Sequence, residues 1–199
     1  MAMTAMIARI RRVLRRRGIV ATGAAACRVA WRRAFQNKNY VFMHSGNVNP
    51  LRPQIDFRIE RYTAMSEIPE HALAAFVSDE GQGFIETATV ELTRGAVLWI
   101  GYISDKPAAR QWTVEGSRIP RWFVPIETDD LVIFNTVTLP EYRGLGISPA
   151  MMLHIISAKP AGRAKVYVDC KVWNRAAIRG IEKAGFTRIA TLSSLGCKL

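Results

Sequence analysis

The stretch from residue 131 to residue 150, LVIFNTVTLPEYRGLGISPA, limits the possible folds of this chain more than any other part of it. Residues 131–139 form a nearly continuous run of β-forming side chains, which is typical of a strand covered on both faces. Pro140 ends the run, because proline cannot donate a hydrogen bond to a neighbouring strand. The stretch therefore predicts a buried strand within a sheet.

A glycine-bearing loop follows this strand and leads into a helix. Gly144 and Gly146 lack a Cβ atom, so the backbone can turn tightly and bring its N–H groups close to a large partner. Ser148 and Pro149 predict the helix start, with serine as the N-cap and proline at the first helical position. Free amides and the positive end of the helix dipole then point the same way, which indicates an anion site.

A second pattern lies further along the chain. Residues 166–174, VYVDCKVWN, predict a strand that ends in asparagine, and residues 175–186 predict a helix stopped by Gly185. Together the two patterns resemble the signature of the GNAT superfamily of acyl-coenzyme A-dependent N-acyltransferases. The resemblance covers roughly residues 56–199. The family's loop, Arg/Gln-x-x-Gly-x-Gly/Ala, is matched by Arg143, Gly146 and, with a departure, Ser148; its asparagine and its Lys-x-Gly-Phe helix end are matched by Asn174, Lys183, Gly185 and Phe186.

The predicted order of elements is β-α-α-β-β-β-α-β-α-β, which suits a mixed sheet with helices on both faces. The resemblance implies the same α/β (α+β) class, with a mostly antiparallel central sheet whose central strands splay apart. A loop rich in Asn, Gly and Pro, residues 44–53, indicates a boundary, and residues 37–39 read as a turn. We therefore expect a basic amphipathic N-terminal segment, residues 1–50, and a GNAT-like acyltransferase domain, residues 51–199.

The resemblance also implies how acetyl-CoA, or another acyl-CoA, is held as co-substrate. The loop amides would bind the pyrophosphate, the backbone of the central strand would pair with the pantetheine arm, and an asparagine would lie beside that arm. These roles fall on Arg143, Gly144, Leu145, Gly146, Ile147 and Ser148 for the pyrophosphate, and on Thr138, Leu139 and Asn174 for the arm.

The sequence departs from the family pattern at two further positions. Pro149 offers no N–H, and Ile181 replaces the tyrosine that protonates the leaving thiolate in many members.

The attacking amine must lose a proton, so a base is needed near the thioester. The thiol lies about five strand residues from the pyrophosphate, at about 3.3 Å per residue. Counting back from Pro140 and from Asn174 reaches Asn135 and Asp169. Asn135 cannot act as a base but can orient a water or the acceptor, whereas Asp169 is the nearest ionisable group. An ion pair with Lys171 on the same strand face is the competing interpretation for Asp169.

The formal net charge of +12 is concentrated at the start of the chain. Residues 1–55 hold 11 basic residues and no acidic one, whereas the other residues hold 17 basic and 16 acidic ones. Apolar side chains recur at spacings of three and four, which predicts a helix with one apolar stripe opposite arginines. The stripe comprises Met3, Met6, Ile7, Ile10, Val13 and Leu14.

Residues 1–40 are open to several interpretations. An interfacial helix on an anionic membrane surface suits the pattern, and so does a helix packed on the domain with its arginines in water. A targeting sequence and a nucleic-acid contact receive less weight, and we do not expect nucleic acid as the partner. An acidic acyl carrier protein would also suit the charge.

The sequence thus predicts an N-acyltransferase that moves an acyl group from coenzyme A to a primary amine of a small molecule, sugar or lipid-linked acceptor. The alternatives are an acyl-carrier-protein-dependent acyltransferase and a non-catalytic acyl-CoA-binding module of the same fold.

Three widely spaced cysteines, Cys27, Cys170 and Cys197, indicate neither a disulfide framework nor a metal site. We therefore expect a cytoplasmic protein, with membrane association and a homodimer left open.

Overall fold

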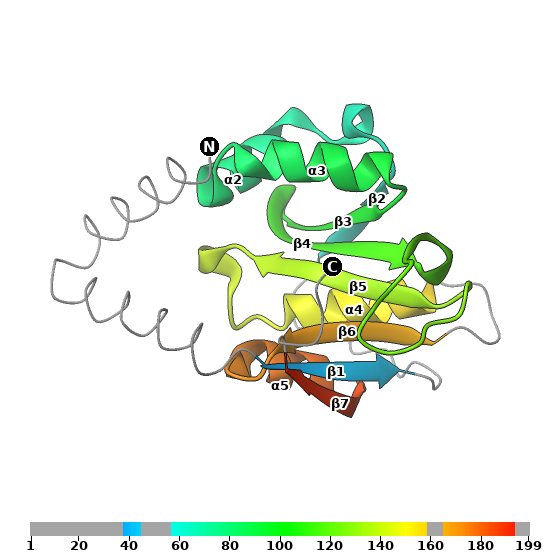
Figure 1. Cartoon of the computed structure of the whole chain (residues 1–199). Coiled ribbons are helices and arrows are strands. Elements are labelled where there is room, and N and C mark those ends of the chain that lie inside the picture. Colours follow the sequence, from blue (N-terminus) through cyan, green and yellow to red (C-terminus); the bar gives the residue numbers. More distant parts are fainter. Residues whose placement is uncertain (1–37, 45–56, 159–164, 194–199) are drawn as a thin grey trace, which may run out of the picture.

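The computed structural model describes residues 38–44, 57–158 and 165–193. Its strands form one seven-stranded sheet in the order β2-β3-β4-β5-β6-β1-β7 (Figure 1). Strands β5 and β6 run parallel and all other neighbours are antiparallel, which confirms the predicted mixed, mostly antiparallel sheet. The strands are β1 (Lys38–His44), β2 (Arg58–Tyr62), β3 (Val97–Ile103), β4 (Lys106–Glu115), β5 (Leu131–Thr138), β6 (Val166–Lys171) and β7 (Thr187–Ser193). The predicted amphipathic helix near the start of the chain lies outside the described residues.

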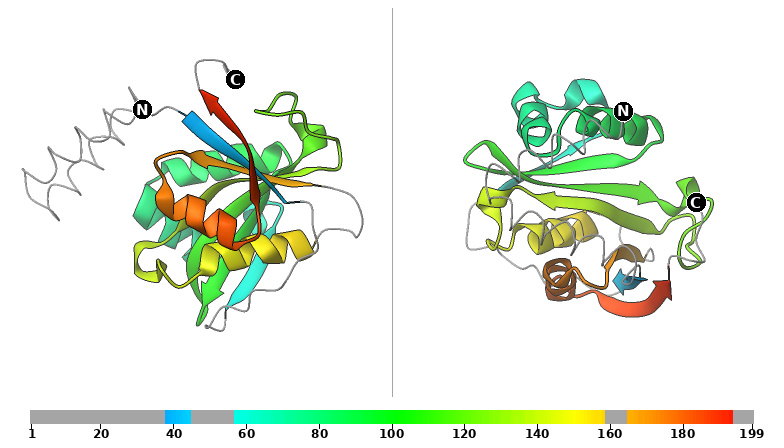
Figure 2. Two further views of the ribbon diagram at one scale, coloured as in Figure 1. Left: turned by 90° about the horizontal axis from the view of Figure 1, so that it is seen from below. Right: turned by 60° about the vertical axis from the view of Figure 1, so that its left-hand side comes forward.

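Helices cover both faces of the sheet, as the order of elements predicted (Figure 2). Helices α2 (Glu70–Glu80) and α3 (Gly83–Thr93) pack on one face, and α4 (Ile147–Ser157) and α5 (Arg175–Lys183) pack on the other. Alternation along β3 explains why this strand is apolar throughout. Leu98 belongs to the core beneath α2 and α3, whereas Trp99 belongs to the core beneath α4.

The first strand, β1, was not predicted. The sequence suggested a turn at residues 37–39, but β1 begins at Lys38 and pairs antiparallel with both β6 and β7. Val41 and Phe42 are completely buried there. The partners of β1 lie more than a hundred residues away, so a local sequence pattern could not reveal the pairing. The sheet therefore includes residues that the expected division at residue 50 assigns to the N-terminal segment.

A loop between β4 and β5 is closed at its base by hydrogen bonds. The backbone N–H of Gly116 donates to the carbonyl of Asp130 over 2.8 Å. The buried carboxylate of Asp130 accepts from the backbone N–H groups of Glu127, at 2.8 Å, and Lys165, at 2.9 Å. These bonds satisfy backbone donors that would otherwise be buried without partners.

We expect Gly116→Ala to lower the free energy of unfolding by about 1–3 kcal/mol, the usual cost of overpacking. A Cβ atom at this position would overlap the carbonyl oxygen of Glu127, which belongs to the backbone and cannot swing away. Urea unfolding measures the effect. Gly83→Ala is the matched control, because a Cβ atom at Gly83 meets nothing within 4 Å. Equal unfolding midpoints for the two variants would contradict this account of the loop.

Candidate active site

Strands β5 and β6 pair over only part of their length. Their parallel ladder joins Leu131 to Val166, Val132 to Tyr167 and Ile133 to Val168. Beyond Ile133, the edge of β5 that faces β6 has no ladder partner among the described residues. The central strands therefore separate, which confirms the predicted splay and leaves backbone groups available to an extended ligand.

A β-bulge lies where the two strands separate. Trp112 of β4 faces Phe134, but Arg110 faces Val137, so β5 has one more residue than β4 over this interval. Asn135 adopts a left-handed backbone conformation with φ of 47°. The bulge shifts the alternation by one residue, so that Phe134 and Val137 share a face although they are three apart. The sequence-based count of strand residues along β5 did not include this extra residue.

The glycine loop has the features of an anion site. Gly144 and Gly146 have φ values of 86° and 76°, which only glycine adopts readily. The backbone N–H groups of residues 144–148 donate no hydrogen bond to any part of the chain that the structure describes. A Cβ atom at Gly144 would meet nothing within 4 Å, and one at Gly146 would meet only Nζ of Lys183, at 3.9 Å. The loop is therefore an open cradle of N–H donors.

Helix α4 begins two residues earlier than the sequence suggested. Gly146 is its N-cap, so Ser148 lies at the second helical position instead of capping the helix. The carbonyl and hydroxyl oxygens of Ser148 accept from Nε2 of the buried Gln111, at 3.0 and 3.2 Å. The first turn of α4 is thus fixed to β4, beside the bulge. Pro149 costs the helix no hydrogen bond, because the first four N–H groups have no intrahelical partner.

Arg143 bends back toward the end of β5. Its Nε donates to the carbonyl of Thr138 over 3.0 Å, while the side chain stays exposed. The N–H of Leu139 donates to the carbonyl of Ala108 at 2.9 Å, and the carbonyl of Leu139 accepts from Tyr142 at 3.0 Å. Both backbone groups of Leu139 are therefore engaged within the protein, and the carbonyl of Thr138 is engaged by Arg143, whereas strand alternation turns the N–H of Thr138 toward the splay.

Asn174 caps α5 at the end of β6. Its Oδ1 accepts from the N–H of Ala177 at 3.2 Å, and its own N–H donates to the carbonyl of Lys171 at 2.8 Å. The side-chain oxygen thereby satisfies one of the unpaired N–H groups of the first helical turn. Asn174 is therefore the N-cap of α5, directly after β6, and its side chain stabilises the first turn of that helix.

Asp169 lies on the face of β6 that points away from α4 and α5. Its neighbours Val168 and Cys170 belong to the core beneath those helices, so alternation turns Asp169 to the opposite face. Oδ2 of Asp169 accepts from Nδ2 of Asn39 on β1 over 2.6 Å. Burial raises the pKa of Asp169, and the Asn39 hydrogen bond and the charge of Lys171 partly oppose this. A carboxyl group with a raised pKa is suited to act as a general base.

An aromatic loop covers part of this face. The indole of Trp122 packs edge-on against the ring of Tyr167, with ring centroids 5.5 Å apart. It also packs against Phe123, with ring centroids 5.4 Å apart. Tyr167 and Asp169 are two residues apart on β6 and so share a face. The loop therefore lies on the same side of the sheet as the carboxylate.

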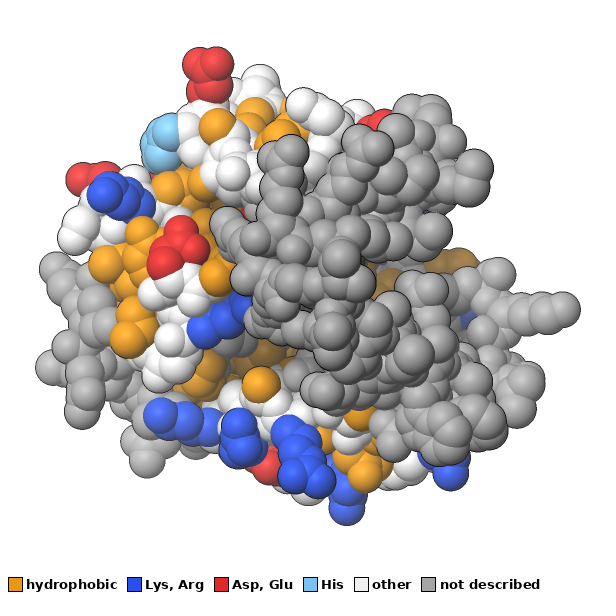
Figure 3. Space-filling view, turned by 90° about the vertical axis from the view of Figure 1, so that its left-hand side faces the viewer, with side chains coloured by type: hydrophobic (Ala, Val, Ile, Leu, Met, Phe, Trp, Pro, Cys, Tyr) orange, Lys and Arg blue, Asp and Glu red, His pale blue; other side chains and the backbone are white. Residues whose placement is uncertain are grey.

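Basic side chains gather at the carboxyl ends of β5 and β6. Figure 3 shows a row of Lys and Arg along the lower part of this end of the molecule, where α5 lies. Helix α5 carries Arg175, Arg179 and Lys183 at intervals of four, and all three are exposed. Sequence reasoning used Lys183 only as part of a motif, although the spacing of four signals one helix face.

Other candidate groups belong to the core. Cys170 is buried, and burial raises the pKa of its thiol to about 11, so the thiol stays protonated near neutral pH. Ile181 faces inward from α5 with only 2% of its surface exposed.

Among the described residues, no group of three or more His, Cys, Asp or Glu side chains could hold a metal ion. No helix in the described ranges has the length and apolar character needed to cross a membrane.

The chain is similar to one protein family and to several solved structures. The acetyltransferase (GNAT) family profile matches residues 53–186. An acetyltransferase of the GNAT family from Colwellia psychrerythraea has 19% identity and a TM-score of 0.52, covering 77% of this chain and 53% of that one. A putative GNAT acetyltransferase from Novosphingobium aromaticivorans has 18% identity and a TM-score of 0.53, covering 78% and 61%. A tandem GNAT protein from the clavulanic acid biosynthesis pathway has 14% identity and a TM-score of 0.54, covering 82% and 56%.

The chain therefore spans between half and two thirds of the length of these three structures. No curated protein matches it.

Proposed function

Because the chain belongs to the acetyltransferase (GNAT) family, we propose that it transfers an acetyl or other acyl group from coenzyme A to a primary amine. The acceptor would be a small molecule, a sugar or a lipid-linked amine. The observation that carries this proposal is the cradle of N–H groups at residues 144–148, which lies directly after the strand that separates from its neighbour. A pyrophosphate needs such donors, and a pantetheine arm needs such a strand edge.

The described residues fit acyl-CoA in two further respects. Gly144 and Gly146 leave open space where side chains would block a phosphate. The basic face of α5 beside the loop complements the negative charge of the nucleotide. When bound, acyl-CoA supplies an acyl group activated as a thioester. The chain itself would hold the pyrophosphate at residues 143–148 and the arm along Thr138, with Asn174 beside it.

Asp169 is our candidate for the general base. As the amine nitrogen bonds to the acyl carbon and the carbon–sulfur bond breaks, Asp169 would accept the proton of the amine. The unpartnered, buried Oδ1 of Asn39 would accept a hydrogen bond from the same amine. Ile181 cannot protonate the leaving thiolate, so another group or water would supply that proton. Asn135 would orient a water or the acceptor from the bulge.

We expect Lys183→Met to weaken acetyl-CoA binding by about 3- to 10-fold. This corresponds to the loss of one partly screened, charge-assisted contact worth about 1 kcal/mol. Calorimetry at low and at high salt measures the effect, which should shrink at high salt because screening weakens exposed charges. Lys106→Met, on the β3–β4 hairpin, is a control that removes an exposed lysine elsewhere. Equal weakening by both variants would remove Lys183 from the site.

An acyl carrier protein is the second candidate donor. The basic residues of α5, together with the cationic residues 1–37, favour it, because carrier proteins present acidic surfaces. A pull-down with acyl carrier protein, compared with acetyl-CoA calorimetry, separates the two donors. A non-catalytic module of the same fold is favoured by Ile181 and would bind acetyl-CoA without any hydrolysis or transfer.

The basic N-terminal segment joins the sheet at the mouth of the splay. The carbonyl of Lys38, the first residue of β1, accepts from the N–H of Val172 at 3.1 Å, two residues before Asn174. Residues 1–37 hold nine basic and no acidic residues. We propose that this segment brings a cytoplasmic enzyme to anionic membrane surfaces, where a lipid-linked acceptor would lie close to the site.

Deleting residues 2–36 is expected to abolish most sedimentation with vesicles that contain phosphatidylserine, while leaving β1 and acetyl-CoA binding intact. Attachment of the full chain should weaken with salt, because the Debye length is about 8 Å at physiological ionic strength. Neutral phosphatidylcholine vesicles are the control. Equal sedimentation of the full and shortened chains with anionic vesicles would rule out this role.

The transfer reaction itself is tested with acetyl-CoA, a panel of primary amines and detection of the released thiol. We expect thiol release that depends on one class of amine. Binding of acetyl-CoA without thiol release in the presence of any amine would favour the non-catalytic module instead.

A further inference from the structure

Arg110 is a buried cation in the middle of β4. Only 1% of its surface is exposed, and its guanidinium lies over the rings of Phe84, at 5.1 Å, and Phe76, at 5.9 Å. A charge in such surroundings persists only when it is paired and hydrogen-bonded, because its transfer from water is costly. The partners of Arg110 therefore show what this side chain holds in place.

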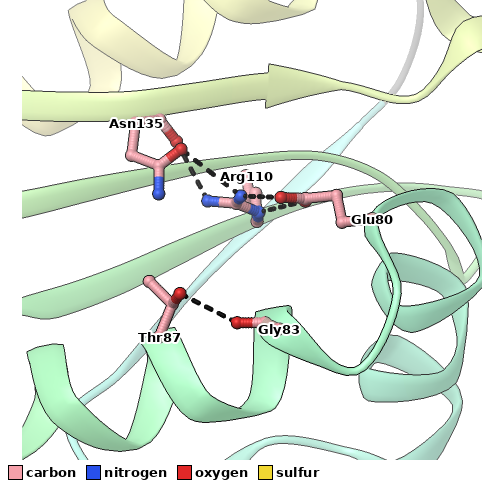
Figure 4. Close-up of polar contacts among 5 residues, drawn as sticks. All are labelled: Glu80, Gly83, Thr87, Arg110 and Asn135. Atoms are coloured by element: carbon pink, nitrogen blue, oxygen red, sulfur yellow. Dashed lines mark hydrogen bonds and ion pairs between the residues drawn. The ribbon is translucent and has the colours of Figure 1, made fainter. Parts of the chain in front are cut away.

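The guanidinium connects two elements that are far apart in the sequence (Figure 4). Nε and Nη2 donate to the two carboxylate oxygens of Glu80, at 2.9 and 2.6 Å. Nη1 donates to the backbone carbonyl of Asn135 at 2.9 Å, and Nη2 lies 3.5 Å from Oδ1 of the same residue. The planar fork of arginine suits this double task, which a lysine ammonium group cannot reproduce.

The contact with Asn135 stabilises the bulge. A left-handed conformation is less favourable for asparagine than for glycine, although asparagine tolerates it better than most other residues. The bulge also interrupts the β4–β5 ladder beside this residue. Arg110 supplies a donor to the carbonyl of Asn135, and this offsets both costs.

Glu80 ties the bulge to the corner between α2 and α3. It is the last residue of α2, and Gly81, with φ of 88°, turns the chain toward α3. Both oxygens of Glu80 are engaged by Arg110, so this carboxylate is held in place at the corner. Its side chain is 28% exposed, whereas Arg110 is almost completely enclosed. Glu80 thus closes over the guanidinium from the solvent side.

The bulge begins immediately after the last β5–β6 pair, Ile133 with Val168. This is the inner end of the splay, the position at which an arm that starts at the glycine loop would end. We propose that Arg110 and Glu80 are positioning residues, which fix the backbone of the bulge against which the thioester carbonyl is held. This inference rests on the proposed function, because it requires acyl-CoA in the splay.

The test uses the full chain and acetyl-CoA labelled with ¹³C at the carbonyl carbon. The carbonyl resonance should move on binding, because the protein polarises and orients this group. In Arg110→Lys we expect most of that displacement to be lost, while the affinity measured by calorimetry changes less than about twofold, since the loop that holds the pyrophosphate is untouched. Adding Asn135→Gly should restore part of the displacement, because glycine adopts the left-handed conformation without the arginine.

Two further variants keep the test decisive. Glu80→Gln leaves Arg110 in place and changes a partly exposed side chain, so it reports on the same unit even if Arg110→Lys fails to fold. Arg58→Lys is the matched control, because Arg58 also lies over an aromatic ring, Tyr102 at 4.9 Å, and pairs with a carboxylate, Asp105 at 3.0 Å.

A full displacement retained in folded Arg110→Lys or Glu80→Gln would overturn the inference, and so would an equal loss in Arg58→Lys. Failure of the unmodified chain to bind acetyl-CoA would instead overturn the proposed function, and this inference with it. Lowered thermal stability without a change of the bound carbonyl resonance would assign Arg110 a purely structural role.

Discussion

Replacing Asp169 with asparagine is expected to lower turnover by about 10²–10⁴-fold, the usual contribution of a general base. Asparagine has the same shape and keeps an oxygen that can accept from Asn39, so the strand pairing should persist. Acetyl-CoA affinity should therefore be unchanged. Turnover is measured by thiol release with the amine found active in the panel, and affinity by calorimetry. Full activity with lower stability would show that Asp169 serves the sheet and not the reaction.

The pH dependence provides an independent check on the same carboxyl group. Burial raises the pKa of Asp169 above the ordinary range for aspartate, about 4. A base must be deprotonated, so activity should be full above this raised pKa and fall as the pH decreases through it. The acidic limb of the profile should vanish in Asp169→Asn, leaving a low rate that does not change over this range. An unchanged limb in the variant would assign the titration to another group.

The second large effect is expected at the glycine loop. Gly146→Val should weaken acetyl-CoA binding by about 10- to 10²-fold, which corresponds to the loss of charge-assisted hydrogen bonds worth about 1.5–3 kcal/mol. A branched Cβ would stand where a phosphate must approach the backbone, and the φ of 76° is unfavourable for valine. Calorimetry with acetyl-CoA measures the change. Unchanged affinity would remove residues 143–148 from the site.

Backbone strain alone could also damage the protein, so a second glycine serves as control. Gly81 has a similar φ, 88°, and a Cβ atom there meets nothing within 4 Å. Gly81→Val therefore introduces backbone strain outside the loop, and at least as much of it, because ψ of −177° at Gly81 lies in a region that essentially only glycine occupies. We expect it to lower stability without weakening acetyl-CoA binding. Equal losses of affinity in both variants would mean that strain, rather than the loss of the cradle, explains the result.

Most of the sheet could be predicted from the sequence because its elements carry local signals. The run at 131–139, the glycine loop and the helix closed by Gly185 each follow from patterns within a few residues. The splay was inferred from the family resemblance, and the β5–β6 register confirms it. The start of α4 was misplaced by two residues, because Gly146 takes the cap position in a left-handed conformation that the serine and proline after it conceal.

Other features depend on contacts across the sequence and could not be predicted. Strand β1 is stabilised by partners at residues 166–171 and 187–193, and only this pairing brings Asn39 to Asp169. Arg110 lies in a buried strand, and nothing in the local pattern shows that its charge is paired with Glu80 or that it donates to the carbonyl of Asn135. The sequence offered an ion pair between Asp169 and Lys171 as the competing interpretation. The charge of Lys171 does act on this carboxyl group, and the hydrogen bond from Asn39 of β1 is a further contact that the local pattern did not show.

The claim that the loop after β5 holds the pyrophosphate of acyl-CoA can be tested most directly by NMR titration of the full, ¹⁵N-labelled chain with acetyl-CoA. The amide resonances of Gly144 and Gly146 should shift with a common saturation curve, because their N–H groups have no hydrogen-bond partner in the described part of the chain and would gain phosphate oxygens. The amides of Gly95 and Gly116 should stay in place. Saturable binding that leaves Gly144 and Gly146 unmoved would contradict the account.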